Sequence, residues 1–253
     1  MKIKTENELL ILREGGKRLA QILHKISEKV APGVSTSELN EYAEELIRSA
    51  GGAPSFKGYS TGGARFPYPA VLCTSINDEI VHAIPGPRTL KDGDIIGLDI
   101  GMRWDGLYTD TAITVPVGVI DKESQKLIEV TKASLAKGIA ALHAGCRLGD
   151  VGSAIHSYVK DHGFDVVREL VGHGVGKAVH ENPEVPNWGR AGFGELIKEG
   201  TVLALEPMVV LGSPRIKLGK DGWAWLTADG ARSAHFEHTV VVAKNGAEIL
   251  TKI

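Results

Sequence analysis

The sequence predicts an α+β protein in which an antiparallel sheet carries helices on one side and is built from two pseudo-symmetric halves. Two runs with helical spacing come first, at 6–30 and 35–51, and a pair of alternating runs follows at 93–116. The same order of helix, helix and strand pair returns later in the chain. Each such unit has an apolar face to bury, so we expect the two units to share one sheet.

The first two helices are predicted from apolar spacing and from the residues at their ends. In residues 6–30 the apolar side chains recur every three or four positions, at Leu9, Leu12, Leu19, Leu23, Ile26 and Val30. Pro32 and Gly33 should end this helix, because neither residue favours its continuation. Ser35 and Glu38 have the spacing of a capping box, which predicts the start of the second helix.

The strand pair at 93–116 is predicted to be a hairpin around an Asp-Gly turn at 105–106. This turn places Gly101 opposite Asp110, so Asp99 and Asp110 become diagonal neighbours on one face of the hairpin. The glycines on either side of Asp99 predict open space beside its carboxylate. The opposite face should carry apolar side chains to the core: Ile96, Leu98 and Ile100.

The second half repeats this order with its own helices and strands. Helices are predicted at 121–144 and about 150–160, and strands at 201–210 and 234–243, with a long loop between the two strands. A duplicated unit of this kind predicts a site where the halves meet. The predicted single domain and its two halves are residues 1–253, about 1–118 and about 119–253.

Charge and composition exclude several classes of protein. Lys and Arg number 29 against 31 Asp and Glu, and no long run of one sign could follow a phosphate backbone. Cys73 and Cys146 offer no disulfide framework, which suits a reducing compartment. Neither a signal peptide nor an 18-residue apolar run is present. We therefore expect a cytoplasmic protein that requires neither nucleic acid nor a membrane.

Four carboxylates together predict a metal centre. Taken alone, an Asp near a turn, such as Asp99 or Asp110, is better explained as a surface group. Glu206 and Glu237, however, lie among β-branched and aromatic residues that predict burial, with no Lys or Arg beside them. The four acids would repel one another unless two divalent cations balanced their charge. His173, set among glycines, is a candidate fifth ligand, and such a centre suits metal-assisted hydrolysis.

Short motifs along the chain carry a resemblance to a known family. Five of them resemble, in this order, the signature of the pita-bread metallopeptidases: LDIG, YTDTA, GHGVG, LEPM and FEHTVVV. Two longer segments are similar to the type I methionine aminopeptidases of that superfamily: NDEIVHAIPGPRTLKDGDII and GHGVGKAVHENPEVPN. The resemblance implies a pita-bread fold and removal of the initiator methionine from nascent polypeptides, with a small second residue preferred. It also implies a monomer that meets polypeptide N-termini near the ribosome.

The resemblance implies a role for each residue of the metal site. Asp110 and Glu237 would bridge two divalent ions, and Asp99 would hold one of them. His173 and Glu206 would hold the other ion, and Glu206 would also carry a proton to the leaving amine. A site of four carboxylates and one imidazole accepts Co, Mn, Fe or Zn.

Further residues are implied to contact the substrate. His82 and His180 match two histidines that stabilise the substrate carbonyl and the tetrahedral intermediate. The methionine pocket is implied at Tyr68, Cys73, Val179 and Trp223. Val179 stands where the family usually has an aromatic residue, and Ala83 where it usually has Gly, so both should affect substrate preference. The other histidines are expected to be surface or packing residues, most of them on predicted helix faces with no acids arranged around them: His24, His143, His156, His162, His235 and His238.

Other interpretations share parts of this pattern. A peptidase that cleaves before proline would use the same five ligands but usually carries an additional N-terminal domain. A type II methionine aminopeptidase is disfavoured because residues 173–237 leave little room for its helical insertion. A non-catalytic relative would have lost ligands, and all five are present here. GHGVGK is not a phosphate loop, since Val171 and Ala178 stand where that loop needs Gly and Ser or Thr.

Overall fold

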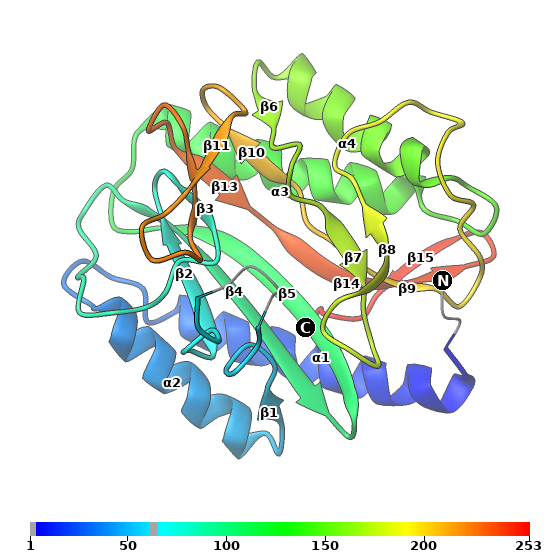
Figure 1. Ribbon diagram of the computed structural model, residues 1–253, viewed down its shortest axis with the longest axis horizontal. Coiled ribbons are helices and arrows are strands. Elements are labelled where there is room, and N and C mark those ends of the chain that lie inside the picture. The colour runs from blue at the N-terminus through cyan, green and yellow to red at the C-terminus, as the bar shows by residue number, and fades with distance from the viewer. Residues whose placement is uncertain (1–3, 61–64) are drawn as a thin grey trace.

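The computed structural model describes residues 4–60 and 65–253 as a curled sheet with a helix pair on each half (Figure 1). Its helices are α1 (Glu6–Ser27), α2 (Thr36–Ser49), α3 (Lys122–Ala141) and α4 (Leu148–Asp161). The first-half strands are β1 (Ala53–Pro54), β2 (Leu72–Ile76), β3 (Glu79–Val81), β4 (Ile95–Trp104) and β5 (Leu107–Pro116). The second-half strands are β6 (Asp165–Val166), β7 (Gly172–Gly174), β8 (Glu181–Val185), β9 (Val202–Leu205), β10 (Met208–Val210), β11 (Ile216–Leu218), β12 (Trp225–Thr227), β13 (Ser233–His235), β14 (Glu237–Ala243) and β15 (Gly246–Ile249). No helix in these described ranges is long and apolar enough to cross a membrane.

The first-half helices both begin at capping boxes. At the start of α1 the backbone N–H of Glu8 donates to Thr5 Oγ1 at 3.3 Å, and Thr5 N–H donates to the Glu8 carboxylate at 2.7 Å. Ser35 and Glu38 make the same pair of bonds at 3.2 and 2.7 Å, so the predicted start of α2 is confirmed. Helix α1 ends at Ser27, slightly earlier than predicted, because the chain turns over residues 28–30.

The predicted hairpin is confirmed, including its register. Strands β4 and β5 pair Gly101 with Asp110, which places Asp99 and Asp110 on the same face. Asp105 and Gly106 both have positive φ, at 45° and 84°. Two successive residues of this kind form the turn whose twist matches a two-residue hairpin.

Nine strands of the described chain form one antiparallel sheet. Its order is β1-β4-β5-β14-β9-β7-β8, with β2 also paired to β4 and β15 to β14. Strands β5 and β14 come from different halves, and they pair Glu237 with Ala112 and His238 with Thr111. This pairing joins the halves at the centre of the sheet and brings Glu237 close to Asp110.

One face of the sheet packs on helices in both halves. Leu98 and Ile100 pack with α1 and α2, and Val240 and Val242 pack with α3 and α4. In Figure 1 the first helix pair lies at the bottom of the view and the second at the top. The strand registers place these four apolar side chains on the same face, so helices cover one side of the curled sheet as predicted. The opposite face carries the acids: Asp99, Asp110 and Glu237.

The predicted strands of the second half are each interrupted. Residues 201–210 give β9 and β10, which are separated at Glu206 and Pro207, and β13 is separated from β14 at Phe236. Strand β9 pairs with β14, whereas β10 pairs with β13 in a smaller sheet that includes β6. Pro207 has no N–H to continue a ladder, so the chain bends there and Glu206 lies at the bend.

The segment 211–233, predicted as a loop, contains two short strands. Strands β11 and β12 pair with each other, and β12 also pairs with β3 of the first half. The prediction was wrong here because each strand has only three residues, too few to show an alternating pattern. Trp223 lies in the turn between β11 and β12 and lines the cavity described below.

Candidate metal centre

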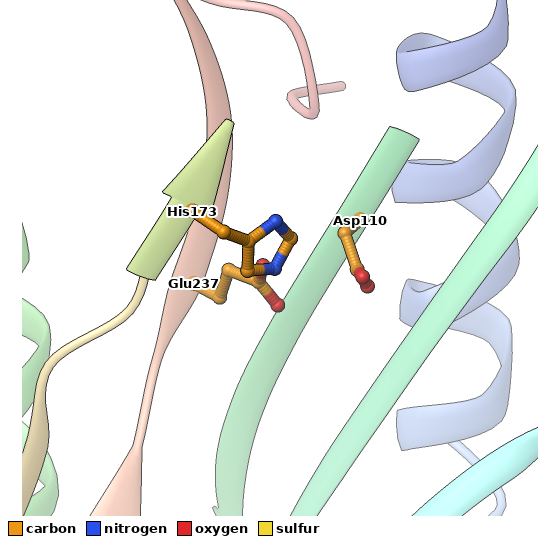
Figure 2. Close-up of side chains that lie close together, drawn as sticks. All are labelled: Asp110, His173 and Glu237. Atoms are coloured by element: carbon orange, nitrogen blue, oxygen red, sulfur yellow. The ribbon is translucent and has the colours of Figure 1, made fainter. Parts of the chain in front are cut away.

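Three of the predicted ligands lie within reach of a single cation. Asp110, His173 and Glu237 each offer a ligand atom, and these atoms lie within 4.8 Å of one another. They come from β5, β7 and β14. In Figure 2 the His173 ring and the Glu237 carboxylate project into the space between their strands and Asp110. The sequence separations are large, so only the pairing of the two halves brings these atoms together.

Asp99 and Glu206 approach the same place from two further elements. Asp99 lies on β4, where it pairs with Cys73 of β2 and Ala112 of β5. Glu206 lies at the bend after β9, and its Oε1 is 3.4 Å from His173 Nε2. All five predicted ligands line one cavity of about 790 Å³.

The residues present fit a divalent cation. Asp99 Oδ1 and Glu237 Oε1 are buried without a hydrogen-bond partner, which is rare for a buried carboxylate oxygen. Within residues 4–60 and 65–253, Glu206 makes its ion-pair contacts with His173 and His235, and no Lys or Arg pairs with any of the four acids. Several carboxylates with one imidazole are a donor set that divalent metals accept. A cation would satisfy both the orphaned oxygens and the uncompensated charge.

Two threonines fix the backbone around the acids. Thr239 Oγ1 accepts a hydrogen bond from Asp110 N–H at 2.9 Å and donates to the Asp110 carbonyl at 2.7 Å. Thr111 Oγ1 donates to the Glu237 carbonyl at 2.8 Å, and Thr111 N–H donates to Asp110 Oδ1 at 3.0 Å. The bonds of Thr239, and that of Thr111 Oγ1, cross between β5 and β14, so they hold the backbone of the two acids in a fixed relation.

His173 is oriented by its own neighbourhood. Its Nδ1 lies 2.9 Å from the Gly174 carbonyl, which makes Nδ1 the donor and leaves the Nε2 lone pair facing Glu206. Glycines are required on both sides, because a Cβ at Gly172 would lie 2.4 Å from the Ala204 carbonyl oxygen and one at Gly174 2.6 Å from that of Asn182. Their role is the close approach of β8 and β9 to β7.

Glycine has a different role beside Asp99 from the one predicted. A Cβ at Gly101 would lie 2.1 Å from Ser55 Oγ and 2.9 Å from the Phe56 ring. The expected open space is therefore filled by residues 55 and 56, and that prediction was wrong at this glycine. At Gly97 a Cβ would make only ordinary contacts, the nearest at 3.6 Å.

Burial raises the pKa of all four acids in the metal-free protein. It raises the pKa of Asp99 to about 7 and that of Glu206 to about 8. It also raises the pKa of Asp110 and Glu237 well above the ordinary range, with added repulsion from the neighbouring carboxylates. Burial lowers the pKa of His173 to about 3, so its imidazole is neutral and can act as a ligand. A bound cation would lower the pKa values of the four acids again, because it favours their ionised carboxylates.

His82 and His180 lie beside this group. The ring of His180 is 4.3 Å from that of His173, and its Nδ1 is 2.7 Å from the Tyr59 hydroxyl. His82 has a φ of 61°, an uncommon conformation for a residue other than Gly. Burial lowers the pKa of His82 to about 4, and it also lowers that of His180. Both imidazoles line the cavity in their neutral form.

The four predicted pocket residues belong to one apolar cluster. Tyr68 packs edge-on against Trp223, with ring centroids 5.2 Å apart, and Cys73 and Val179 belong to the same cluster. Tyr68, Cys73 and Trp223 line the cavity, whereas Val179 packs in the cluster and is not among the lining residues. Sequence reasoning missed two more lining residues, Phe56 and Tyr59, because no periodic pattern or family motif marks their segment.

Most of the remaining histidines were expected to have no acids around them, but three of the six lie beside one. His24 Nε2 lies 3.6 Å from Glu28, and His156 Nε2 lies 3.2 Å from Asp165. The third is His235, which is buried and has its Nε2 3.6 Å from Glu206 Oε2. Its position in AHFEHT, two residues before Glu237, was a signal for a shared strand face that could have indicated this.

Fold and site together are those of a metal-dependent hydrolase, and comparison with known proteins specifies the family. The model of Metallopeptidase family M24 matches residues 11–244, and the chain belongs to this family. It is 48% identical over 251 residues to methionine aminopeptidase of Clostridium perfringens, covering 99% of this chain and 98% of that relative. The crystal structure of methionine aminopeptidase from Thermotoga maritima matches with a TM-score of 0.96 and 40% identity, covering 100% of both chains.

A more distant likeness concerns the fold alone. Xaa-Pro dipeptidase from Bacillus anthracis matches with a TM-score of 0.77 at 20% identity, covering 99% of this chain and 62% of that one. The predicted family, pita-bread fold and hydrolase class are confirmed by these comparisons. Use of divalent metal follows from membership of a metallopeptidase family together with the ligand group at Asp110, His173 and Glu237.

Proposed function

We infer that this chain is a methionine aminopeptidase, which removes the initiator methionine from polypeptide N-termini by metal-assisted hydrolysis. The observation that carries this inference is the convergence of four uncompensated carboxylates and His173 in a cavity that is also lined by the apolar cluster of Tyr68, Cys73 and Trp223. The full-length similarity to methionine aminopeptidases supports it. We further propose that the protein acts as a cytoplasmic monomer on nascent chains near the ribosome.

Two divalent ions, drawn from Co, Mn, Fe or Zn, would be held by the five ligands. Asp110 and Glu237 would bridge them, which is supported by the position of both side chains at the junction of the halves. Asp99 would hold one ion, and His173 with Glu206 the other, in line with the 3.4 Å between these last two residues. Bound ions of this kind supply Lewis acidity for the peptide carbonyl and lower the pKa of water.

The residues around the ions would orient the substrate and move protons. Glu206 lies at the cavity wall, where its carboxylate would take up a proton and pass it to the leaving amine. The Tyr59 hydroxyl would donate to His180 Nδ1, which leaves the proton on Nε2 for the oxygen of the tetrahedral intermediate. His82, neutral and on the same cavity wall, would donate to the substrate carbonyl.

Substrate preference would follow from the pocket and from the space next to it. The methionine side chain would lie against Tyr68, Cys73 and Trp223, and the soft thioether suits such walls. Val179 is smaller than the aromatic residue usual at this position and would leave additional room. The second residue would lie between His82 and His180, so a small one should be preferred.

A panel of short peptides with Mn²⁺ tests the function. We expect rapid cleavage of Met-Ala-Ser, slow cleavage of Met-Lys-Ser and none of N-acetyl-Met-Ala-Ser, because acylation removes the amine that binds metal. Val179 should permit some cleavage of Leu-Ala-Ser. Val179→Phe should lower the rate of Leu-Ala-Ser cleavage more than the rate of Met-Ala-Ser cleavage. Faster cleavage of Ala-Pro-Ser than of Met-Ala-Ser would assign the chain to the proline-specific group, and no cleavage of any free-amine peptide would indicate a non-catalytic protein.

A further inference from the structure

His235 is a buried imidazole that the proposed chemistry leaves without a role. It ends β13, where it pairs with Met208 of β10, and the residue is 3% exposed. Its backbone is held from the first half, since Thr114 Oγ1 accepts a hydrogen bond from His235 N–H and donates to its carbonyl, both at 2.8 Å. These bonds fix the main chain of His235 beside the site, and the side chain is buried there.

The ring nitrogen of His235 is aimed at the carboxylates and has no partner. Nε2 is buried and makes no hydrogen bond, although it lies 3.6 Å from Glu206 Oε2. A buried polar atom without a partner is uncommon and points to an interaction completed by a further group. A small shift of the Glu206 carboxylate would bring its Oε2 within hydrogen-bond distance of His235 Nε2.

Glu206 lies between two imidazoles that contact its two oxygens. Oε1 is 3.4 Å from His173 Nε2, and Oε2 is 3.6 Å from His235 Nε2. His173 offers a lone pair on that nitrogen, because its Nδ1 is occupied by the Gly174 carbonyl. The two histidines can therefore act differently on one carboxylate: His173 shares an ion with it, and His235 donates to it.

We propose that His235 is a positioning residue that donates a hydrogen bond from Nε2 to Glu206 Oε2 and so orients this carboxylate toward metal and substrate. Carboxylates that bind metal are commonly held by such partners, and loss of a partner typically costs about 10–100-fold in metal affinity or activity. The proposal rests on the proposed metal-dependent function, in which Glu206 is both a ligand and a proton carrier.

The neighbouring His238 provides a matched control. His235 lies two residues before Glu237 and His238 directly after it, but His238 lies on the opposite face of the sheet and its Nδ1 is 3.0 Å from Thr251 Oγ1. Substitution of His238 therefore removes an imidazole from the same stretch of chain without removing a contact to an acid. His235→Gln is the conservative variant, because a glutamine amide can place an N–H near the position of Nε2.

The test is Mn²⁺ binding measured by calorimetry on chelator-treated protein, with Met-Ala-Ser hydrolysis measured in parallel. We expect His235→Leu to raise the Mn²⁺ Kd by about 10–100-fold, and to lower kcat at saturating Mn²⁺ with little change in KM. His235→Gln and His238→Leu should stay close to the wild type in both measurements. A wild-type Kd and kcat in His235→Leu, or an equal loss in His238→Leu, would overturn the proposal.

Two further comparisons keep the test decisive. If His235→Leu does not fold, His235→Asn replaces it, because asparagine is one methylene shorter than glutamine and should fail to reach Glu206. Equal Mn²⁺ affinity of the Asn and Gln variants would then overturn the proposal. Failure of the wild type to cleave Met-Ala-Ser would refute the proposed function, whereas the Mn²⁺ affinities would still decide the role of His235.

Discussion

Two groups of buried charge lie close together in this protein and are neutralised in different ways. Lys4 Nζ is 2.9 Å from Glu181 Oε2, and the two side chains are 1% and 6% exposed. Burial alone would raise the pKa of Glu181, but the hydrogen bond and the attraction of Lys4 lower it below its ordinary value. The second group has raised pKa values and no Lys or Arg partner among the described residues: Asp99, Asp110, Glu206 and Glu237.

The comparison shows what the second group lacks. A buried carboxylate is tolerated where a counter-charge compensates for its lost hydration, and Lys4 does this for Glu181. At the centre of the sheet the chain supplies four acids and neutral histidines instead. Their counter-charge has to come from outside the chain, which is the structural basis for a cation at this position.

The largest effect is expected when one acid of the uncompensated group is neutralised. Asp110→Asn removes a proposed bridging ligand, so metal binding and peptide hydrolysis should both be lost. The fall in kcat should exceed the roughly 10²–10³-fold that follows loss of a single oxyanion donor. Asp105→Asn, at the exposed turn of the same hairpin, is the matched control and should leave both unchanged. Full activity of Asp110→Asn with normal metal content would show that the acid is not a ligand.

Removal of the internal counter-charge should instead reduce stability. Lys4→Met leaves the Glu181 carboxylate buried without its cationic partner, bonded only to the N–H groups of Lys177 and Ala178, which should lower the free energy of unfolding by about 3–5 kcal/mol. Adding Glu181→Gln should recover most of this loss, because the double variant has no stranded charge. Urea denaturation of the two variants gives both values. A change below about 1 kcal/mol in the single variant would mean that the pair behaves as a surface ion pair.

The two groups should also differ in how pH affects them. In metal-free protein the folded pKa values of Asp99 and Glu206, about 7 and about 8, lie above their unfolded values of about 3.9 and 4.3. The folded state then binds more protons, so the stability from these groups is fully present below about pH 4 and is lost as pH rises to about 8. Thermal unfolding at pH 5 and pH 8 should show this fall in chelated protein but not with Mn²⁺ bound. An equal melting temperature at both pH values without metal would contradict the prediction.

The smallest effect is expected at an exposed ion pair. Arg13 Nη2 lies 2.8 Å from Glu248 Oε2, but the side chains are 38% and 40% exposed. Water already compensates both charges, so Arg13→Met should change the free energy of unfolding by at most about 1 kcal/mol. A loss as large as that of Lys4→Met would remove the distinction between buried and exposed pairs.

Much of the centre could be predicted from local rules. The Asp-Gly turn at 105–106 fixes the hairpin register, and with it the positions of Asp99 and Asp110 on one face. Glu237 was predictable as a buried strand acid, because its neighbours are apolar and β-branched. These features depend on residues close in sequence, where turn chemistry and alternation act directly.

Features that depend on distant contacts were not predictable in the same way. The Lys4 and Glu181 pair joins residues far apart in the chain, and neither residue is marked by a pattern. The contact between His235 and Glu206 arises because β10 and β13 pair beyond the bend at Pro207. Tyr59 and Phe56 reach the cavity from a segment without regular structure. Such contacts follow from the curl of the sheet, which local sequence does not encode.

The central claim is that a divalent cation is the counter-charge of the buried acids, and calorimetric titration of Mn²⁺ at pH 6 tests it most directly. At this pH the raised pKa values leave the metal-free carboxylates largely protonated, so binding must release protons. Titration in two buffers with different ionisation enthalpies measures that release. We predict two ions bound per chain with more than one proton released, and a smaller release in Glu237→Gln. Binding without proton release, or no binding at all, would contradict the claim.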